Sequence, residues 1–390
     1  MGCMNHSLAA LFMGALGGFL LAHQAAKGDF IFGEPLPVVN LNTTSADTSP
    51  CMTPDGLELY FASNRDHGAD LCYQDIWVVT RTAIDEPWGT PVNLGEPVNR
   101  PYGPEINPSL SADGLELYFD DGWAALTSES ALRPGGHGRG DIWVSKRETR
   151  EAEWGLPVNL GPAINSFEYD GTAHISADGL SLYFCSARTS GHGFDLYVST
   201  RPTKSDPWSP AEELGAPINT MAAQDYLTYP FLSADGLSLF FSAAPLGYRA
   251  RGDIYMSTRA TVTDTWGKPS RLATLNSTQH DTCVTFSVND PTIYFVRCDP
   301  YNPNASYEPA LATFDLWQAA VAPILDLNVD GTVDCADICI LVDHWHTYNS
   351  WCDIAPAPLG DGFVDVQDLV LLVEEVTRTA AGANDIHTGR

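Results

Sequence analysis

Oxygen-bearing side chains alternate along residues 326–337 in a spacing that suits a divalent cation. The stretch reads DLNVDGTVDCAD, with acidic or amide side chains at its first, third, fifth, ninth and twelfth positions and a glycine at its sixth. A hard cation such as Ca²⁺ takes oxygen ligands at alternate positions around a tight turn, and the seventh position contributes its backbone carbonyl. The pattern predicts a calcium site with the ligands Asp326, Asn328, Asp330, Thr332, Asp334 and Asp337.

A second, less complete copy of this loop lies at residues 357–368. Its later half, DGFVDVQD, keeps the acidic pattern, but its first and third positions are Ala357 and Leu359. Either Asp353 or backbone carbonyls must compensate, or the second site is weak. The ligands expected there are Asp361, Asp365 and Asp368. Apolar residues follow each loop at the spacing of one helix face, namely Ile338, Leu341, Val342 and Trp345, then Leu369, Leu372, Val373 and Val376.

Another set of acidic side chains precedes a repeated motif, Ser-x-Asp-Gly or Thr-x-Asp-Gly. The residues six positions before the motif are Asp47, Glu105, Asp170, Leu227 and Asp281. Clustered carboxylates can push each other's pKa values apart and serve as acid and base. An enzyme acting on polysaccharide, a glycosidase or a lyase, would have the candidate catalytic residues Asp47, Glu105, Glu168 and Asp170.

Two other interpretations of these carboxylates remain open. They follow the period of the repeat, whereas catalytic groups usually break it, and Asp is common at strand ends and turns for purely local reasons. We therefore favour capping of strands and turns over catalysis. A carboxylate ring could also hold Ca²⁺ or another cation in a channel.

The elements that position these residues come from a repeat of about 54 to 65 residues. Its core is a nine-residue stretch such as SADGLELYF at 111–119, which recurs at 53–61, 176–184, 233–241 and, in altered form, 287–295. The alternation in LxLYF predicts a half-buried strand, and Asp-Gly suits the positive φ of a tight hairpin turn. A DIWV-like block and a block such as WGLPVNLG supply two further strands. Four-stranded units of this kind, arranged radially, predict an all-β, five-bladed propeller over residues 30–321.

The two ends of this region are expected to close the ring. The fifth unit stops after its third strand near Trp317, whereas residues 32–41, FGEPLPVVNL, have the spacing of a fourth strand and precede the first unit. Pairing the two would remove an exposed sheet edge. The tryptophans that recur once per unit, at 88, 154, 208 and 266, are expected to pack between blades.

The repeats resemble the WD40-like family known as PD40 or TolB-like propeller repeats, whose hallmark S-x-D-G-x-x-L-x-F begins at Ser111, Ser176, Ser233 and, with Thr, at Thr53. The resemblance implies a propeller whose first strand is innermost, so that the acidic candidates lie on one loop face. It does not imply one function, because propellers include enzymes, receptors and scaffolds.

The C-terminal module, residues 322–377, resembles a type I dockerin with paired loop-helix calcium units, and that resemblance implies docking onto a cohesin-like or other cell-surface protein. Cohesin contact in the family often uses Ser-Thr at loop positions ten and eleven. Here these positions hold Cys335 and Ala336, then Val366 and Gln367. The resemblance therefore implies calcium binding by this module, but it does not identify a partner protein.

Charge and the first residues indicate the compartment. The formal charge of −29 argues against nucleic acid as a partner. An apolar run within residues 8–22 predicts a signal peptide at 1–26, although no Lys or Arg precedes it, so an uncleaved anchor is the alternative. After cleavage no stable membrane span is expected. Cys283 and Cys298 flank the fifth hairpin, where a disulfide is plausible.

These observations favour a secreted or periplasmic bacterial protein with a disordered tail at 378–390. We expect a non-catalytic propeller that binds carbohydrate or protein on its loop face and is tethered through the calcium-dependent module. The alternative is the polysaccharide-degrading enzyme described above.

Overall fold

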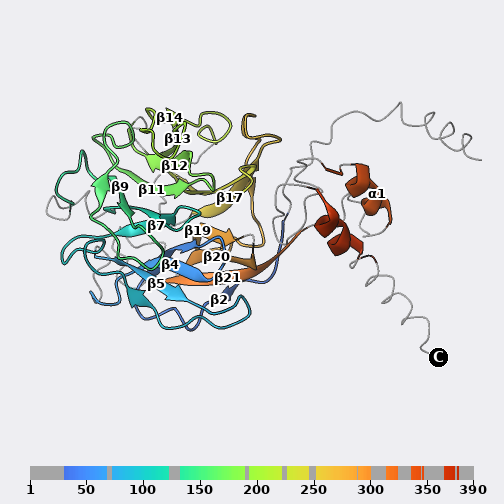
Figure 1. The fold of residues 1–390 in the computed structure, drawn as a ribbon, viewed down its shortest axis with the longest axis horizontal. Coiled ribbons are helices and arrows are strands. Elements are labelled where there is room, and N and C mark those ends of the chain that lie inside the picture. The colour runs from blue at the N-terminus through green and yellow to red at the C-terminus, as the bar shows by residue number, and fades with distance from the viewer. Residues whose placement is uncertain are drawn as a thin grey trace, which may run out of the picture.

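The computed structural model describes residues 30–67, 73–122, 132–188, 193–221, 226–245, 252–287, 289–299, 313–323, 335–343, 345–346, 364–373 and 376. The strands form five antiparallel sheets that make up the blades of a propeller (Figure 1). The predicted all-β, five-bladed propeller of four-stranded blades is confirmed. The signal segment and the tail after 377 lie outside the described residues.

Each blade runs from an inner to an outer strand in chain order. Blade one contains β3 (Asp47–Met52), β4 (Glu58–Ser63), β5 (Asp75–Thr80) and β6 (Val92–Asn93). Blade two contains β7 (Ile106–Leu110), β8 (Glu116–Asp120), β9 (Ile142–Lys146) and β10 (Val158–Asn159). Blade three contains β11 (Asp170–Ile175), β12 (Ser181–Ser186), β13 (Asp195–Thr200) and β14 (Glu212–Glu213), and blade four contains β15 (Tyr226–Leu232), β16 (Ser238–Ala244), β17 (Asp253–Thr258) and β18 (Ser270–Arg271). Blade five contains β19 (His280–Ser287), β20 (Asp290–Asp299) and β21 (Thr313–Pro323), with β1 (Phe30–Phe32) and β2 (Leu36–Pro37) at its outer edge.

The outer edge of blade five comes from the N-terminal end of the described chain. Strand β1 pairs antiparallel with β21, Phe30 opposite Pro323, and β2 pairs with the same strand, Leu36 opposite Gln318. The side-chain amide of Asn42 then donates to the Leu316 carbonyl at 2.9 Å. The predicted closure of the ring is confirmed, and the otherwise open edge of β21 is covered.

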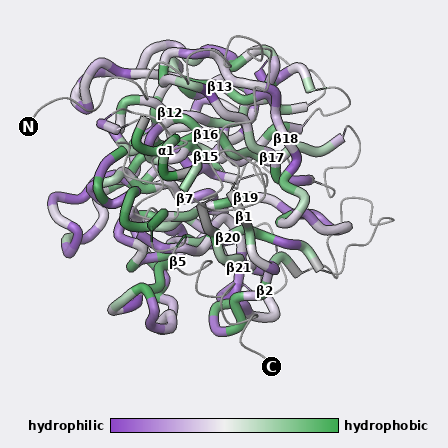
Figure 2. The backbone as a smooth tube through the Cα atoms, turned by 90° about the vertical axis from the view of Figure 1, so that its right-hand side faces the viewer, coloured by the Kyte–Doolittle hydropathy of each residue, from purple (hydrophilic) through white to green (hydrophobic). Residues whose placement is uncertain are grey.

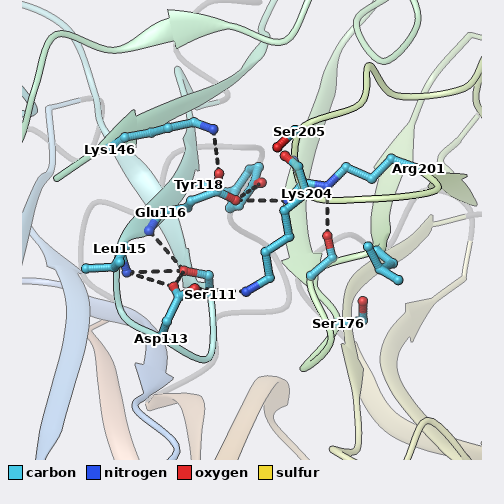
Figure 3. Close-up of polar contacts among 12 residues, drawn as sticks. Ser111, Asp113, Leu115, Glu116, Tyr118, Lys146, Ser176, Arg201, Lys204 and Ser205 are labelled. Atoms are coloured by element: carbon cyan, nitrogen blue, oxygen red, sulfur yellow. Dashed lines mark hydrogen bonds and ion pairs between the residues drawn. The ribbon is translucent and has the colours of Figure 1, made fainter. Parts of the chain in front are cut away.

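The Ser-x-Asp-Gly motif makes the turn between the two inner strands, as seen in blade two (Figure 3). The Ser111 hydroxyl donates to Asp113 Oδ1 at 2.6 Å and accepts from the Glu116 amide at 2.9 Å, while the Leu115 amide donates to Asp113 Oδ1 at 3.1 Å. Gly114 has a φ of 72°, a conformation that favours glycine. The motif therefore fixes the register of each hairpin.

Hydrophobic packing joins neighbouring blades. Figure 2 shows hydrophobic segments gathered in the strands and hydrophilic ones in many of the connecting loops. The indole of Trp88 in blade one donates to the Tyr294 hydroxyl of blade five at 3.3 Å, and Arg81 lies over the Trp88 ring at 4.3 Å. The same arginine pairs with Asp290 of blade five at 2.5 Å. Trp88 thus packs between blades, as predicted.

Two short helices form the described part of the C-terminal region, α1 (Cys335–Asp343) and residues 366–373. Leu341, Val364 and Leu372 are their buried core. Val342 and Val373, predicted to lie on the apolar face, are instead 51% and 39% exposed. In the described part of the chain, no helix has the length and apolar character needed to cross a membrane.

The disulfide considered for the fifth hairpin does not form. Cys298 lies opposite His280 in the β19–β20 ladder, and Cys283 lies at a bulge further along β19. Neither cysteine is part of a disulfide. Cys283 is three residues along β19 from the partner of Cys298, so the two side chains do not face each other across the ladder.

Candidate functional site

Three of the predicted catalytic carboxylates stand where an inner strand begins. Asp47 opens β3, Asp170 opens β11, and Glu105 directly precedes β7. All three are fully buried, as is Asp281 near the start of β19. Burial of four charges at equivalent places demands a partner for each.

An arginine pairs with each of these carboxylates. The guanidinium Nη2 of Arg65 lies 2.6 Å from Asp47 Oδ1, and that of Arg188 lies 2.6 Å from Asp170 Oδ1. Glu105 pairs with Arg100 and Arg133 at 2.6 and 2.9 Å, and Asp281 pairs with Arg297 at 2.6 Å. We call these four carboxylates, each with its arginine or arginines, the clasps. Burial outweighs the two arginines at Glu105 and raises the pKa of that carboxyl.

The second oxygen of each clasp carboxylate accepts from the loop before the strand. Asp47 Oδ2 accepts from the Thr43 amide at 2.7 Å, and Asp170 Oδ2 accepts from the Ser166 hydroxyl at 2.7 Å. Glu105 Oε2 accepts from the Arg100 amide at 3.0 Å. Each carboxylate therefore ties an incoming loop to its inner strand and to its arginine. That geometry is the one expected of capping groups.

Glu168 differs from the other candidates. Its side chain is 39% exposed and its carboxylate lies 3.5 Å from Arg139, which is itself 58% exposed. This surface pair is separate from the clasp of Asp170 in the same loop. The four candidate catalytic carboxylates therefore take part in separate ion pairs, with different arginines.

The axis of the propeller is nearly closed. Each inner strand carries one bulge with a left-handed residue, and the five residues are Ser49, Asn107, Thr172, Tyr229 and Cys283, with φ between 50° and 57°. They line a central cavity of about 30 Å³. Such a volume holds about one water molecule and excludes a substrate. Non-glycine residues with positive φ are uncommon, and here they recur around a ring.

Polar contacts connect the blades around this axis. The Ser49 hydroxyl donates to Asn107 Oδ1 at 2.6 Å, and the Tyr229 amide donates to Thr172 Oγ1 at 3.1 Å. The Cys283 amide donates to the Ser242 hydroxyl of blade four at 3.2 Å. The backbone and side-chain polar groups of the bulges therefore hold neighbouring blades together.

Asp120 joins blade two to blade three at the same level, and sequence reasoning missed it. Its carboxylate accepts from the Asn107 side chain at 2.7 Å, the Thr172 amide at 2.7 Å and the Tyr169 hydroxyl at 3.2 Å. Full burial raises its pKa to about 6, although these donors act in the opposite sense. The equivalent positions in the other blades hold Ala62, Cys185, Ser242 and Val296. An alignment of the repeats would have found this break in their symmetry.

The next residue, Asp121, is a second departure from the symmetry of the repeats. Its amide donates to the Asp141 carbonyl at 3.3 Å, so the two residues stand opposite each other in continuation of the β8–β9 ladder. Both are 1% exposed. Burial, together with the charge of Asp141, raises the pKa of Asp121 to about 7. Like charges opposite each other on adjacent strands are destabilising, so protonation of this pair is favoured.

Most predicted calcium ligands lie outside the described residues, namely Asp326, Asn328, Asp330, Thr332, Asp334 and Asp361. Asp337 falls within α1. Asp365 and Asp368 are described and cap the helix at 366–373, because the Asp365 amide donates to Asp368 Oδ2 at 2.7 Å and the Gln367 amide donates to Asp365 Oδ1 at 2.7 Å. Across the part of the chain that the structure describes, no group of three or more His, Cys, Asp or Glu side chains could hold a metal ion.

The fold and the clasps define the class of protein, a five-bladed β-propeller with four-stranded blades. No family model and no curated protein matches the sequence. Solved structures similar to this chain include TolB from Acinetobacter baumannii, with 15% identity, a TM-score of 0.40 and coverage of 72% of this chain and 56% of TolB. An endo-arabinase from Bacteroides thetaiotaomicron has 14% identity, a TM-score of 0.47 and coverage of 75% and 97%. A structure titled glycoside hydrolase has 10% identity, a TM-score of 0.47 and coverage of 75% and 92%.

Proposed function

We propose that the protein is an exported, non-catalytic propeller that binds a ligand or protein on its loop face. The observation that carries this proposal is the clasp. Asp47, Glu105 and Asp170 are fully buried, each is paired with arginine, and each also accepts from its incoming loop. A glycosidase needs two carboxyl groups that flank a bond in an accessible cleft. The clasps and the closed axis support a binding role.

This part of the proposal is tested by seeking turnover. The purified mature chain is incubated with arabinan, xylan, mixed-linkage glucan and pectin, and new reducing ends and unsaturated ends are measured. We expect none above the level of a chain carrying Asp47→Asn. Turnover that is lost in a folded clasp variant would contradict the proposal.

We further propose that the C-terminal module binds Ca²⁺ and tethers the propeller to a cohesin-like or other cell-surface protein. The sequence supplies hard oxygen donors at Asp326, Asn328, Asp330, Thr332, Asp334 and Asp337, and at Asp361, Asp365 and Asp368. Bound Ca²⁺ would hold each loop against its helix. The capping contacts of Asp365 and Asp368 are compatible with this donor set, because they order the end of the second loop.

An exposed apolar stripe supports the docking role of the module. Val366, Val370 and Val373 stand at the first, fifth and eighth positions of one helix and are 59%, 50% and 39% exposed. Cys335, Cys339 and Val342 occupy the same spacing on α1, and all three are exposed. The buried core of Leu341, Val364 and Leu372 lies elsewhere on the helices. Two matching apolar stripes fit a protein partner better than they fit solvent.

Calcium calorimetry tests the tether on the full mature chain. We expect binding that Asp330→Ala abolishes or weakens by at least about tenfold, because a loop that loses one charged ligand loses affinity. The matched control is Asp206→Ala, which removes an exposed aspartate from a propeller turn and should leave calcium binding unchanged. Equal binding by Asp330→Ala and the unchanged chain would rule out the first loop as the site.

The second candidate function is the polysaccharide-degrading enzyme, and Asp120 is the observation in its favour. It breaks the repeat, and its pKa of about 6 lies in the range of a general acid. Its burial and its donors from three segments favour a structural role. The discriminating variant is Asp120→Asn, which would abolish any turnover if Asp120 were the acid.

A further inference from the structure

Blade four departs from the clasp pattern. Where the other blades have a buried acid, it has Leu227, which lies opposite Ala243 in the β15–β16 ladder. Pro245 stands two residues after Ala243, the place that Arg65 and Arg188 occupy after Ser63 and Ser186. The three positions that take part in a clasp in other blades therefore hold the apolar residues Leu227, Ala243 and Pro245 in blade four.

The aromatic residue of the third strand in blade four differs from its counterparts in its described contacts. In the other blades a guanidinium lies over the aromatic residue of the third strand, at 5.0 Å from Trp77, 5.6 Å from Trp143, 4.8 Å from Tyr197 and 4.4 Å from Trp317. The equivalent residue in blade four is Tyr255, opposite Phe241. Within the described ranges, no arginine lies over its ring. Among the described residues of blade four, no guanidinium fills the space that one fills in the other blades.

A cleft of about 220 Å³ opens at this place. Its walls are Ala243 and Pro245 on one side, Asp253 at the start of β17 and Arg271 at the end of β18, and the loop residues Ser277, Thr278 and Gln279. Asp253 begins a third strand, and the loop leads into β19, so the cleft belongs to the loop face. Its volume is below the roughly 300–1,000 Å³ of pockets for drug-sized ligands, and suits a single ring.

The polar wall of the cleft is an accessible ion pair. Arg271 Nε donates to Asp253 Oδ2 at 2.7 Å and Nη2 donates to Asp253 Oδ1 at 2.8 Å, and the two side chains are 40% and 27% exposed. At the same place in blades one and two, Asn93 and Asn159 donate to aspartates that are almost fully buried. The longer arginine therefore turns a closed contact into a solvent-facing one.

This chemistry favours a neutral ligand over a charged one. Asp253 already occupies the Nε and Nη2 donors of Arg271, and the protein's formal charge of −29 repels anions. A cation gains little from Asp253, because Arg271 already neutralises it. A neutral molecule with several hydroxyl groups can donate to the free lone pairs of the carboxylate, accept from the outer guanidinium nitrogen, and place its CH groups on Ala243 and Pro245.

We propose that the cleft between β17, β18 and the 277–279 loop binds one neutral sugar residue, either free or at the end of a glycan. This inference rests on the proposed function, since it names the ligand class of the loop face. Binding is expected to be weak, with a dissociation constant on the order of millimolar, because the site is small and wet.

Saturation-transfer NMR on the mature chain tests the proposal with D-glucose, D-galactose, D-mannose, D-xylose and L-arabinose. At least one sugar should bind, and Arg271→Ala should weaken that binding by about tenfold or more, the effect of losing one well-placed charged donor. A second variant, Thr278→Trp, leaves the ion pair intact and fills the mouth from an exposed position. The Thr278→Trp variant should abolish sugar binding. The thermal unfolding of both variants is checked in parallel.

The control is Arg150→Ala, which removes an arginine of similar exposure that pairs with Asp55 in a hairpin turn on the opposite face. It should bind sugar as the unchanged chain does. No binding by any of the five sugars, or binding that survives both cleft variants, overturns the inference without touching the non-catalytic role. Cleavage of a bound glycoside would instead overturn the non-catalytic role and leave the cleft assignment standing.

Discussion

The Nη2 atom of Arg188 lies 2.6 Å from the Oδ1 atom of Asp170, and the same aspartate accepts from Ser166 through its other oxygen. One carboxylate thereby joins the second strand of a blade, its first strand and the loop that arrives from the preceding blade. The aspartate is fully buried, and the arginine side chain is 19% exposed. The contact explains why acidic residues recur at this position without requiring chemistry there.

Breaking this clasp should destabilise the fold strongly. For Arg188→Ala we expect a loss of about 3–5 kcal/mol in the free energy of unfolding, because it leaves a buried carboxylate without its charge partner. Urea unfolding measures the loss. Glu168→Ala, in the same loop but half-exposed, should change the free energy of unfolding by less than about 0.5 kcal/mol. Similar values for the two variants would refute the clasp interpretation.

The Asp121 and Asp141 pair predicts a stability that falls as pH rises. The native pKa of Asp121 is raised to about 7, so the native state holds a proton that the unfolded state has already released. The penalty is absent below the unfolded pKa and is fully present above the native one. Asp121→Asn should therefore stabilise the protein at about pH 8, by an amount on the order of 2 kcal/mol, and much less at about pH 5.

Thermal unfolding of Asp121→Asn and the unchanged chain at the two pH values measures this difference. Asp206→Asn, at an exposed turn, provides the control and should show no such pH dependence. An equal effect of Asp121→Asn at both pH values would show that the pair does not carry a proton.

The two hydrophobic positions 372 and 373 test the packing of the C-terminal helices. Leu372 is fully buried, whereas Val373 is 39% exposed. Leu372→Ala should cost about 2–5 kcal/mol of local stability, because it leaves a cavity in a small core, and Val373→Ala should cost much less. Hydrogen exchange of the backbone amides in residues 335–376, with Ca²⁺ present, distinguishes the two. Equal protection in both variants would mean that the helices do not pack through Leu372.

The axis makes a separate prediction about Asp120. Asp120→Ala would remove the acceptor of the Asn107 side-chain amide and of the Thr172 backbone amide. Each unpaired buried group costs about 1–3 kcal/mol, so the melting temperature should fall by several degrees. The comparison is Ser242→Ala, which removes a neutral acceptor at the equivalent position of blade four and should cost less. A reversed order would mean that Asp120 is strained rather than stabilising.

The repeat could be predicted from the sequence because its signals are local. Asp-Gly with a positive φ at Gly114 and the alternation of LxLYF lie within nine residues, and the closing strand was recognisable from its spacing alone. The partners of the clasp carboxylates were not recognisable. Arg65 follows Asp47 and Arg188 follows Asp170 by 18 residues, but Arg133 follows Glu105 by 28 and Arg297 follows Asp281 by 16. Arg65 and Arg188 follow the second strand by two residues, whereas Arg297 lies within β20 opposite Asp281, so no fixed spacing marks the arginine.

The cleft of blade four was also beyond the sequence analysis, since it depends on three positions from separate strands and loops. Leu227, Ala243 and Pro245 are unremarkable one at a time. They become informative only when the repeats are compared in register. The same comparison identifies Asp120 and Asp121, because a residue that departs from a structural repeat is no longer explained by it.

The pairing of Phe30 with Pro323 has a mechanical consequence. The chain enters and leaves the ring at neighbouring points of one antiparallel pair, so pulling these two points apart would unzip β1 from β21 one hydrogen bond at a time. Hydrogen bonds loaded in sequence resist far less force than bonds loaded together. A protein held through only one of these points would keep its ring closed under load, whereas opposing pulls through both would open it at this seam first.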